Sequence, residues 1–279
     1  MTILVTGATG SVGRLVVDEL LARGAKNVRA LTVDPNRAEL PEGVEVVTGY
    51  LGTPATLPAA LDGVDTVYLA PMPAKVKDFA EAAEKAGVRR VVVLSGANAD
   101  SEAMAPEEHW FYYACEHAIE AAGFEWTHLR PGVFMNNTLG WADALRSEGV
   151  VRAPYGQVVQ TPIDLKDIAE VAAVTLLEGG HVGKKYILSG PDAITQVDQV
   201  KMIGAAIGKD VSWEELTPDE ARELWSVQGM PADVAEFLLE GFENTMRNPQ
   251  VPVTTVTDLT GRPGRTFAQW AEGNADKFA

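Results

Sequence analysis

Cysteine, histidine and long apolar runs are scarce in this sequence of 279 residues. Cys115 is the one cysteine, so an intrachain disulfide and a cysteine zinc site are both excluded. The 4 histidines form neither an H-E-x-x-H pair nor a group with obvious carboxylate partners, so we expect no bound metal. A sequence with so little cysteine fits a reducing compartment, and we expect the cytoplasm.

Basic residues are also few, because 23 Lys and Arg stand against 39 Asp and Glu, a formal net charge of -16. With no run rich in Lys or Arg, the chain lacks the charge that a nucleic-acid or anionic-membrane surface requires. No apolar stretch approaches the roughly 18 residues that span a bilayer. An expected strand also stands where a signal peptide needs a basic segment. We therefore expect no nucleic-acid partner, no membrane span and no secretion.

Apolar runs and amphipathic segments alternate through the first half of the chain. Strands are expected at 3–5, 28–33, 44–47, 66–70, 91–94 and 124–129, and helices at 12–24, 56–61, 76–86 and 107–122. Continuously apolar strands between amphipathic helices indicate a parallel sheet that is covered on both faces. The sequence therefore predicts an α/β fold with a Rossmann-type doubly wound parallel sheet.

The pattern loosens from about residue 135. The later elements are expected to be a helix capped by Asp167 and ending at Leu177, a strand at 185–188, helices after Thr195, after Pro218 and over 232–242, and a loop at 249–263. We therefore expect a dinucleotide-binding domain over residues 1–155. A smaller, mostly helical subdomain for a substrate or partner is expected over 156–279, interleaved with the first because the 185–188 strand returns to the main sheet.

Three glycines, Gly7, Gly10 and Gly13, follow the first expected strand directly and open the first expected helix. Glycine allows a tight turn, a close approach of a pyrophosphate to the backbone, and close packing of helix against strand. The N–H groups at the helix N-terminus then bind the phosphates, so an acidic protein needs no basic patch for this purpose. A glycine turn without a ligand is the alternative, but the strand before it and the helix after it favour a dinucleotide.

The spacing G-x-x-G-x-x-G differs from the G-x-G-x-x-G of many dehydrogenases. Further motifs are Val-Arg-Ala-Leu at 28–31, Asp-Gly-Val-Asp at 62–65, Leu-Arg-Pro-Gly-Val-Phe-Met-Asn-Asn at 129–137, Asp-Ile-Ala at 167–169 and Thr-Gly-Arg-Pro at 260–263. Together they resemble the NmrA-like, atypical branch of the short-chain dehydrogenase/reductase superfamily, from residue 3 to about residue 270. The resemblance implies an NAD(P) bound along the carboxyl ends of the strands and a variable C-terminal region over a substrate or partner site.

The glycine turn, the end of the second strand and the resemblance together give the residues expected to contact the cofactor. They are Gly7, Thr9, Gly10, Ser11, Val12, Gly13, Thr32, Arg37, Leu51, Ala70, Pro71, Ser95, Gly96, Pro131, Gly132 and Phe134. Ser95 stands where the superfamily keeps a catalytic serine.

The end of the second expected strand bears on the choice between NAD(H) and NADP(H). NAD-specific folds place an acidic residue there to hold the ribose 2′-hydroxyl. Asp34 is one position late and precedes Pro35, so we expect it to cap the next helix instead. NmrA-like relatives often carry an arginine where Val33 stands, and Thr32 with Arg37 could replace it on a 2′-phosphate. We favour NADP(H) over NAD(H); a solvated surface role for Arg37 is the alternative.

The Tyr-x-x-x-Lys pair with which short-chain reductases protonate their substrates is not found. Aligning the family's glutamate with Glu116 places Tyr112 at the lysine position and Glu108 at the tyrosine position, and shifting the frame restores no lysine. Tyr112 and Asn136 remain as catalytic candidates. Hydride delivery to a quinone yields a stabilised phenolate that water can protonate, so positioning against the nicotinamide suffices for such an acceptor.

Four aromatic residues, Trp110, Tyr113, Trp141 and Tyr155, are expected beside the nicotinamide end, where they would suit a flat aromatic substrate. Core packing is the alternative for each of them.

We therefore predict an NADPH-dependent reductase that passes hydride to a quinone or an aromatic polyketide-like carbonyl. The resemblance implies a small aromatic substrate and a place as the reducing component of a monooxygenase system in secondary metabolism, beside a partner hydroxylase. The alternative is a regulatory protein that senses NAD(P) without catalysis and signals to a protein partner. The changed tyrosine and lysine positions favour that alternative.

Overall fold

The computed structural model describes residues 1–279, except for the side chain of Glu108. The chain forms two compact units. The first unit comprises Met1–Gly132, Leu165–Leu188 and Thr255–Pro263, and the second comprises Val133–Asp164, Ser189–Thr254 and Gly264–Ala279. The boundary expected at residue 155 does not coincide with this division, because the chain first leaves the first unit at Gly132 and returns to it twice.

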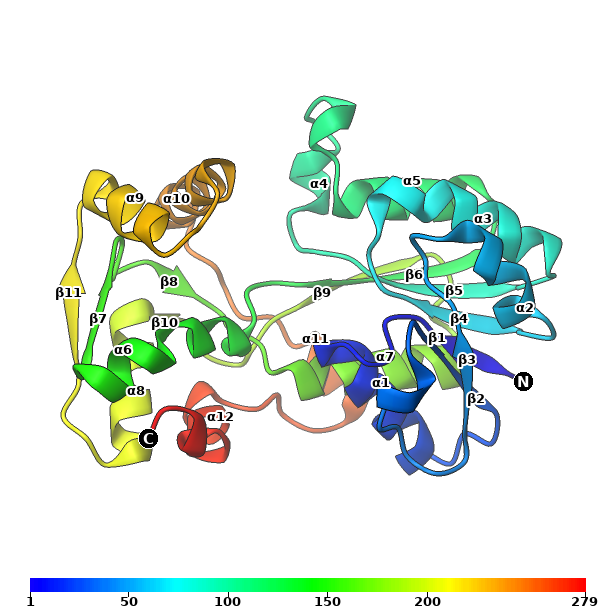
Figure 1. Cartoon of the computed structure of the whole chain (residues 1–279), viewed down its shortest axis with the longest axis horizontal. Helices are drawn as coiled ribbons and strands as arrows, with labels where there is room; N and C mark the ends of the chain where they lie inside the picture. The colour runs from blue at the N-terminus through cyan, green and yellow to red at the C-terminus, as the bar shows by residue number, and fades with distance from the viewer. The chain divides into compact units, whose positions relative to one another are not determined.

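The first unit contains a seven-stranded sheet in the order β3-β2-β1-β4-β5-β6-β9, and all neighbouring strands are parallel (Figure 1). The strands are β1 (Ile3–Val5), β2 (Val28–Thr32), β3 (Val44–Thr48), β4 (Thr66–Leu69), β5 (Arg90–Leu94), β6 (Glu125–Pro131) and β9 (Lys184–Leu188). The predicted doubly wound parallel sheet is confirmed. The strand order reverses between β1 and β4, and ligands of such sheets bind where the order reverses, at the carboxyl ends.

Helices cover both faces of this sheet. Those of the first unit are α1 (Ser11–Ala22), α2 (Leu57–Leu61), α3 (Val76–Lys85), α4 (Ala99–Glu102), α5 (Tyr112–Ala121), α7 (Leu165–Leu177) and α11 (Thr255–Thr260), with short 3-10 turns η1 (Pro35–Arg37), η2 (Pro54–Thr56), η3 (Pro73–Lys75) and η4 (Glu107–His109). Figure 1 shows α2, α3 and α5 on one face and α1, α7 and α11 on the other.

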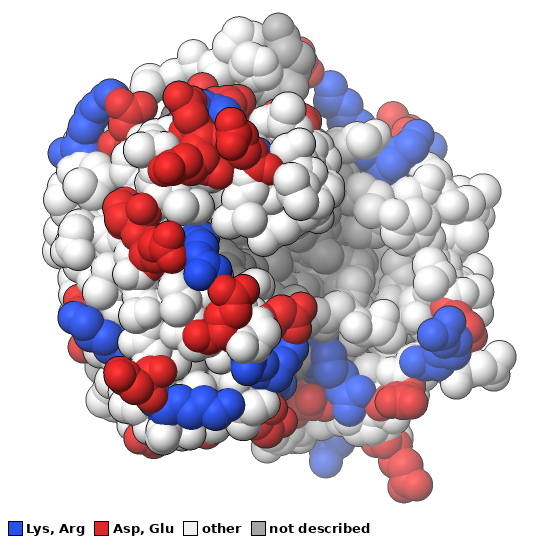
Figure 2. Space-filling view, turned by 60° about the vertical axis from the view of Figure 1, so that its left-hand side comes forward, with Lys and Arg blue, Asp and Glu red and all other residues white. Residues whose placement is uncertain are grey.

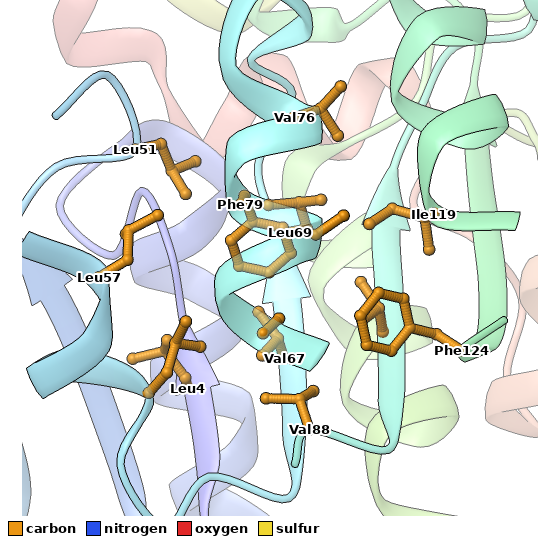
Figure 3. Close-up of a cluster of buried hydrophobic side chains, with 14 of the residues drawn as sticks. Leu4, Leu51, Leu57, Val67, Leu69, Val76, Phe79, Val88, Ile119 and Phe124 are labelled. Atoms are coloured by element: carbon orange, nitrogen blue, oxygen red, sulfur yellow. The ribbon is translucent and has the colours of Figure 1, made fainter. Parts of the chain in front are cut away.

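Side chains alternate between these faces, as they must in a strand. Val67 and Leu69 of β4 point into a core beneath α2, α3 and α5, where they meet Phe79 and Ile119 (Figure 3). Tyr68 points to the opposite face and is also fully buried. Both faces of β4 are therefore covered, which explains why all four of its residues are buried.

The helix expected over 107–122 begins later, at Tyr112. The carboxylate of Glu102 accepts hydrogen bonds from the backbone N–H groups of Phe111 (3.0 Å) and Tyr113 (2.8 Å). These groups at the start of α5 have no partner within the helix, so an acceptor from α4 fixes where α5 begins.

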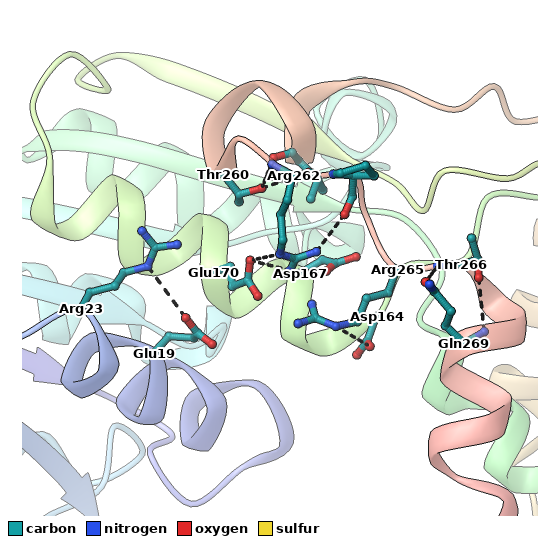
Figure 4. Close-up of polar contacts among 12 residues, drawn as sticks. Glu19, Arg23, Asp164, Asp167, Glu170, Thr260, Arg262, Arg265, Thr266 and Gln269 are labelled. Carbon is teal, nitrogen blue, oxygen red and sulfur yellow. Dashed lines mark hydrogen bonds and ion pairs between the residues drawn. The ribbon is translucent and has the colours of Figure 1, made fainter.

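The segment expected as a loop over 249–263 contains α11, and Asp167 does not cap a helix. Helix α7 begins at Leu165, and Asp167 lies buried in its first turn. Arg262, which follows α11, donates to the carboxylates of Asp167 (2.8 Å) and Glu170 (2.7 Å), as Figure 4 shows. The capping prediction was wrong because α7 begins two residues before Asp167, which places this residue inside the first turn and not at the N-cap.

The second unit is mostly helical. Its elements are η5 (Met135–Trp141), α6 (Ala142–Ser147), β7 (Val150–Ala153), β8 (Val159–Gln160), β10 (Ile194–Thr195), α8 (Gln196–Ile207), β11 (Ser212–Glu215), α9 (Pro218–Val227), α10 (Ala232–Arg247), α12 (Phe267–Gly273) and η6 (Ala275–Lys277). Strand β7 pairs in parallel with β11, and β8 pairs antiparallel with β10. The helices expected after Thr195 and Pro218 are confirmed; the short strands were not predicted.

Charged side chains of both signs lie close together on the surface. On the face shown in Figure 2, Lys and Arg are scattered among Asp and Glu rather than gathered in one patch. No helix in the described part of the chain is both long and apolar enough to cross a membrane.

Candidate functional site

The turn after β1 is closed by its own glycines. Gly7 has φ +60, and a Cβ there would lie 3.0 Å from the Cβ of Ala70. A Cβ at Gly13 would lie 2.1 Å from the Gly7 carbonyl oxygen, so the first turn of α1 packs directly on the turn. Gly10, the N-cap of α1, supplies no side-chain cap, and the first turn of α1 holds no acidic residue. The residues therefore fit an anion such as a pyrophosphate at this N-terminus.

The residues around Gly10 differ in their exposure to solvent. Thr9, Gly10 and Ser11 are exposed, whereas Val12 is buried beneath them.

A hydroxyl that the sequence analysis missed holds the ends of β1 and β4 together. Thr6 donates to the carbonyl of Tyr68 (3.0 Å) and accepts from the backbone N–H of Ala70 (2.8 Å). Ala70 and Pro71 thereby lie beside the glycine turn, at the reversal of strand order. A threonine inside an apolar strand end was the available signal, since a buried hydroxyl needs partners.

The end of β2 shows how its polar residues are used. Thr32 is buried, and its hydroxyl accepts from the N–H of Asp34 (3.3 Å). The Asp34 carboxylate accepts from the N–H of Asn36 (3.0 Å), which confirms its expected capping role. Arg37 is exposed in η1 and forms no ion pair within the described chain. The Asp34 carboxylate is thus engaged with the backbone of η1, while the Arg37 guanidinium is exposed to solvent.

A buried ion pair lies beneath the loop that follows β5. Arg130 and Glu116 are 3% and 0% exposed, and the guanidinium donates Nε to Oε1 (2.8 Å) and Nη2 to Oε2 (2.7 Å). Burial opposes ionisation of Glu116, but hydrogen bonds from Arg130 and Ser95 hold its pKa below the ordinary value. Arg130 also pairs with Asp100 of α4 (2.9 Å). The pair therefore connects β6, α5 and α4 around the end of β5.

Ser95 is part of this network and not of an open site. Its hydroxyl donates to Glu116 (2.5 Å), and the residue is 1% exposed. The Ser95 hydroxyl is thus engaged with Glu116, and the contact of this residue with the cofactor stays a prediction.

Tyr112 is the catalytic candidate that lies at the strand ends. A Cβ on Gly96 would lie 2.5 Å from the Tyr112 ring, so the ring covers the loop after β5. Burial raises the pKa of the Tyr112 phenol, and the Glu102 carboxylate raises it further. The phenol therefore stays protonated at neutral pH. Glu108, at the position expected for the family's tyrosine, has its side chain outside the described part of the structure.

A comparison with protein families matches residues 7–178, more than half of the chain, to the family described as NAD(P)H-binding. The chain belongs to this family. The match starts within the glycine turn and confirms the NAD(P) cofactor expected from the glycine spacing.

Two curated relatives align over almost the whole chain. The (4-alkanoyl-5-oxo-2,5-dihydrofuran-3-yl)methyl phosphate reductase of Streptomyces griseus subsp. griseus is 40% identical over 286 residues, 99% of each chain. The NAD(P)H azoreductase of Xenophilus azovorans is 34% identical, also over 99% of each chain. Both are named as reductases, which confirms the predicted class: this family member is an NAD(P)H-dependent oxidoreductase.

Solved structures of the family share the fold. The NADPH-dependent quinone oxidoreductase QOR2 of Escherichia coli, complexed with NADPH, has a TM-score of 0.86 at 25% identity over 98% of this chain and 99% of its own. The fold is also that of NmrA, at 18% identity, and the NmrA-like resemblance is confirmed at the level of fold.

Two of the aromatic residues expected at the substrate site lie elsewhere in the first unit. The rings of Trp110 and Tyr113 pack edge to face (centroids 4.7 Å apart), and Tyr113 stacks on His117 (5.7 Å). Trp110 and His117 line a surface hollow between α3 and α5. The substrate role expected for Trp110 and Tyr113 stays a prediction.

Three further residues expected at the cofactor, Leu51, Pro131 and Gly132, lie in the first unit. Leu51 is 6% exposed and packs in the core cluster of the first unit, and its contact with the cofactor stays a prediction. Pro131 ends β6, and the N–H of Gly132 donates to the carbonyl of Leu188 (3.0 Å), which leaves both at the edge of the sheet.

The remaining expected residues belong to the second unit. They are Phe134, Asn136, Trp141 and Tyr155. Trp141 packs edge to face on Trp213 (5.8 Å) against the core of that unit. Tyr155, at φ +60, holds a left-handed conformation that is rare for a bulky residue.

Proposed function

We propose that the protein is an NADPH-dependent reductase that transfers hydride to a quinone or an aromatic polyketide-like carbonyl. The observation that carries the proposal is the glycine turn before α1, where the uncapped helix N-terminus without acidic residues fits the pyrophosphate of NADPH. The Tyr112 ring lies against Gly96, in the loop after β5. A bound NADPH supplies the hydride. The protein supplies position and a protonated phenol, and the acceptor must stabilise the negative charge that hydride addition creates.

The names of the relatives support an acceptor of this kind. An azo compound, a quinone and a 5-oxo-2,5-dihydrofuran that carries an alkanoyl group are all conjugated and poor in electrons. In each of them the charge from an added hydride spreads over the conjugated system, so a strong general acid matters less than it does for an isolated ketone.

The choice of NADPH is supported at the end of β2. The Asp34 carboxylate is used by the backbone of η1, and it would repel a 2′-phosphate if it faced the ribose. Arg37 offers a planar guanidinium in the same segment, which suits a phosphate.

A place in a monooxygenase system is the finer part of the proposal. The product of quinone reduction is an electron-rich hydroquinone, the form of the ring that a partner hydroxylase can oxygenate. The second candidate function, an NAD(P) sensor without turnover, is favoured by the lack of a lysine at position 112.

The deciding experiment mixes the purified protein with NADPH or NADH and a panel of naphthoquinones, anthraquinones, an azo dye and an aliphatic ketone. Nicotinamide absorbance is followed under nitrogen and then in air. Rapid anaerobic oxidation of NADPH by the quinones is expected, with no reduction of the ketone. Extra consumption in air indicates reoxidation of the product by oxygen.

The variant Tyr112→Phe tests the phenol in the same assay. We expect a quinone rate within about threefold of the wild type, because a phenolate product needs little help from an acid. A loss of a hundredfold or more would make Tyr112 an essential proton donor. Tight NADPH binding without turnover on any acceptor would refute the reductase and establish the sensor.

A further inference from the structure

Arg14 connects the glycine turn to the loop that follows β2. It is the residue after Gly13, whose close contact with the Gly7 carbonyl fixes the start of α1. From there Arg14 donates Nη1 to the carbonyl of Glu39 (2.6 Å), and Nε bonds to Asp18 one turn along the helix (3.2 Å). The side chain thus reaches from the phosphate end of the expected cofactor site to residue 39.

Glu39 has an unusual backbone. Its φ is +47, in the left-handed region that non-glycine residues seldom adopt. Such a conformation persists only where the surroundings hold it. The Glu39 side chain is exposed and forms no ion pair within the described chain. The hydrogen bond from Arg14 to the Glu39 carbonyl instead supports the bend from the side of α1.

The loop is therefore fixed at both ends. At its start, Thr32, Asp34 and Asn36 form the two hydrogen bonds of the cap described above. At its end stands the bond between Arg14 and Glu39. Arg37 lies between these two points, so its direction depends on both of them.

We propose that Arg14 is a positioning residue for cofactor choice. It holds the left-handed bend at Glu39, and so keeps Arg37 directed at the 2′-phosphate of NADP(H). This inference rests on the proposed preference for NADPH and adds a residue outside the β2 end itself. In this proposal Arg37 binds the phosphate, and Arg14 supports the loop that carries Arg37.

The test measures the dissociation constants of NADPH and NADH by titration calorimetry for the wild type, Arg14→Ala and Arg14→Lys. Arg14→Ala should weaken NADPH by about tenfold, the scale of one hydrogen bond to a charged group, and NADH by less than about twofold. Arg14→Lys should recover most of the loss, since an ammonium can also donate to the carbonyl. Arg23→Ala is the matched control, because Arg23 is the C-cap of the same helix and forms its ion pair within the described chain with Glu19 (3.8 Å).

The double variant Arg14→Ala with Glu39→Gly distinguishes support of the loop from direct phosphate contact. Glycine adopts φ > 0 without steric cost, so it should keep the bend without Arg14 and restore NADPH affinity to within about threefold of the wild type. Failure of this rescue overturns the positioning role, as do equal losses for the two nucleotides in Arg14→Ala. A wild type that binds NADH as tightly as NADPH overturns both this inference and the proposed cofactor preference, whereas unchanged NADPH affinity in Arg14→Ala overturns the inference alone.

Discussion

Replacing Glu116 by glutamine removes one charge from the core and almost no volume. The carboxylate accepts from Nε and Nη2 of Arg130 and from the hydroxyl of Ser95, and it is fully buried. Glutamine offers one acceptor oxygen in place of two and turns an amide N–H₂ toward the guanidinium. Arg130 would then remain 3% exposed with Asp100, which is itself 78% exposed, as its anionic partner.

The expected cost is large because a buried cation loses its main counter-charge. Breaking a buried ion pair by removing one partner costs about 3 to 5 kcal/mol. Each kcal/mol lowers the melting temperature of a protein of this size by about 2 to 4 °C, so Glu116→Gln should melt about 10 °C below the wild type. Thermal melts followed by circular dichroism give the melting temperature, and urea titrations at neutral pH give the free energy of unfolding. The indole of Trp126 in β6 serves as a probe of the first unit.

The matched control is the pair of Arg222 and Glu236 in the second unit. It has the same two-point geometry, with Nε and Nη2 donating at 2.6 and 3.0 Å, but both side chains are more than two-fifths exposed. Glu236→Gln should therefore leave the free energy of unfolding nearly unchanged, since water screens such pairs. Equal losses in the two variants would contradict the argument from burial, as would a loss below about 1 kcal/mol in Glu116→Gln.

Two further predictions concern the pH dependence of stability and two glycine positions. Because the pKa of Glu116 is lowered in the folded state, its stabilising contribution is complete above the unfolded value of about 4.3 and is lost as the pH falls through the folded value. Urea titrations from pH 7 to pH 3 should show an acid loss that is smaller in Glu116→Gln. A Cβ at Gly13 would lie 2.1 Å from a backbone oxygen, so Gly13→Ala should lose nucleotide binding and stability together, whereas Gly241→Ala, on an open face of α10, should gain about 0.5 to 1 kcal/mol. Calorimetry and thermal melts check both, and a Gly13→Ala protein that binds NADPH normally would refute the packing of α1 on the turn.

The sheet and the glycine turn could be predicted from the sequence because their signals are local. Short apolar runs such as Ile3–Val5 and glycines at fixed spacing depend on neighbours along the chain. The capping role of Asp34 was available for the same reason, since the acceptor and Pro35 stand side by side. In the second unit, β8 and β10 have 2 residues each, which is too few for any periodicity to be read.

The pairs that fix the candidate site are distant in sequence, and no local pattern reveals them. Arg262 reaches Asp167 across 95 positions, and Arg130 reaches Glu116 across 14. The start of α5 depends on Glu102, which accepts from an N–H 11 positions later. That start sets which aromatic residue faces the strand ends. The resemblance pointed to Tyr112 through its spacing from Glu116, but the run of aromatic residues from Trp110 to Tyr113 carries no local signal for where α5 begins.

The hydrogen bond between the buried Ser95 hydroxyl and Glu116 bears on which acceptors the enzyme can reduce. A serine that touches the substrate and a lysine that lowers the pKa of a tyrosine would together favour proton transfer to a ketone oxygen. Here the serine donates to Glu116, no lysine stands at position 112, and the pKa of Tyr112 is raised rather than lowered. Each change weakens proton delivery, while the glycine turn that orients the cofactor is intact. The proposed reductase is therefore suited to acceptors whose conjugation stabilises the added charge, and an isolated aliphatic ketone should remain unreduced even at high concentration.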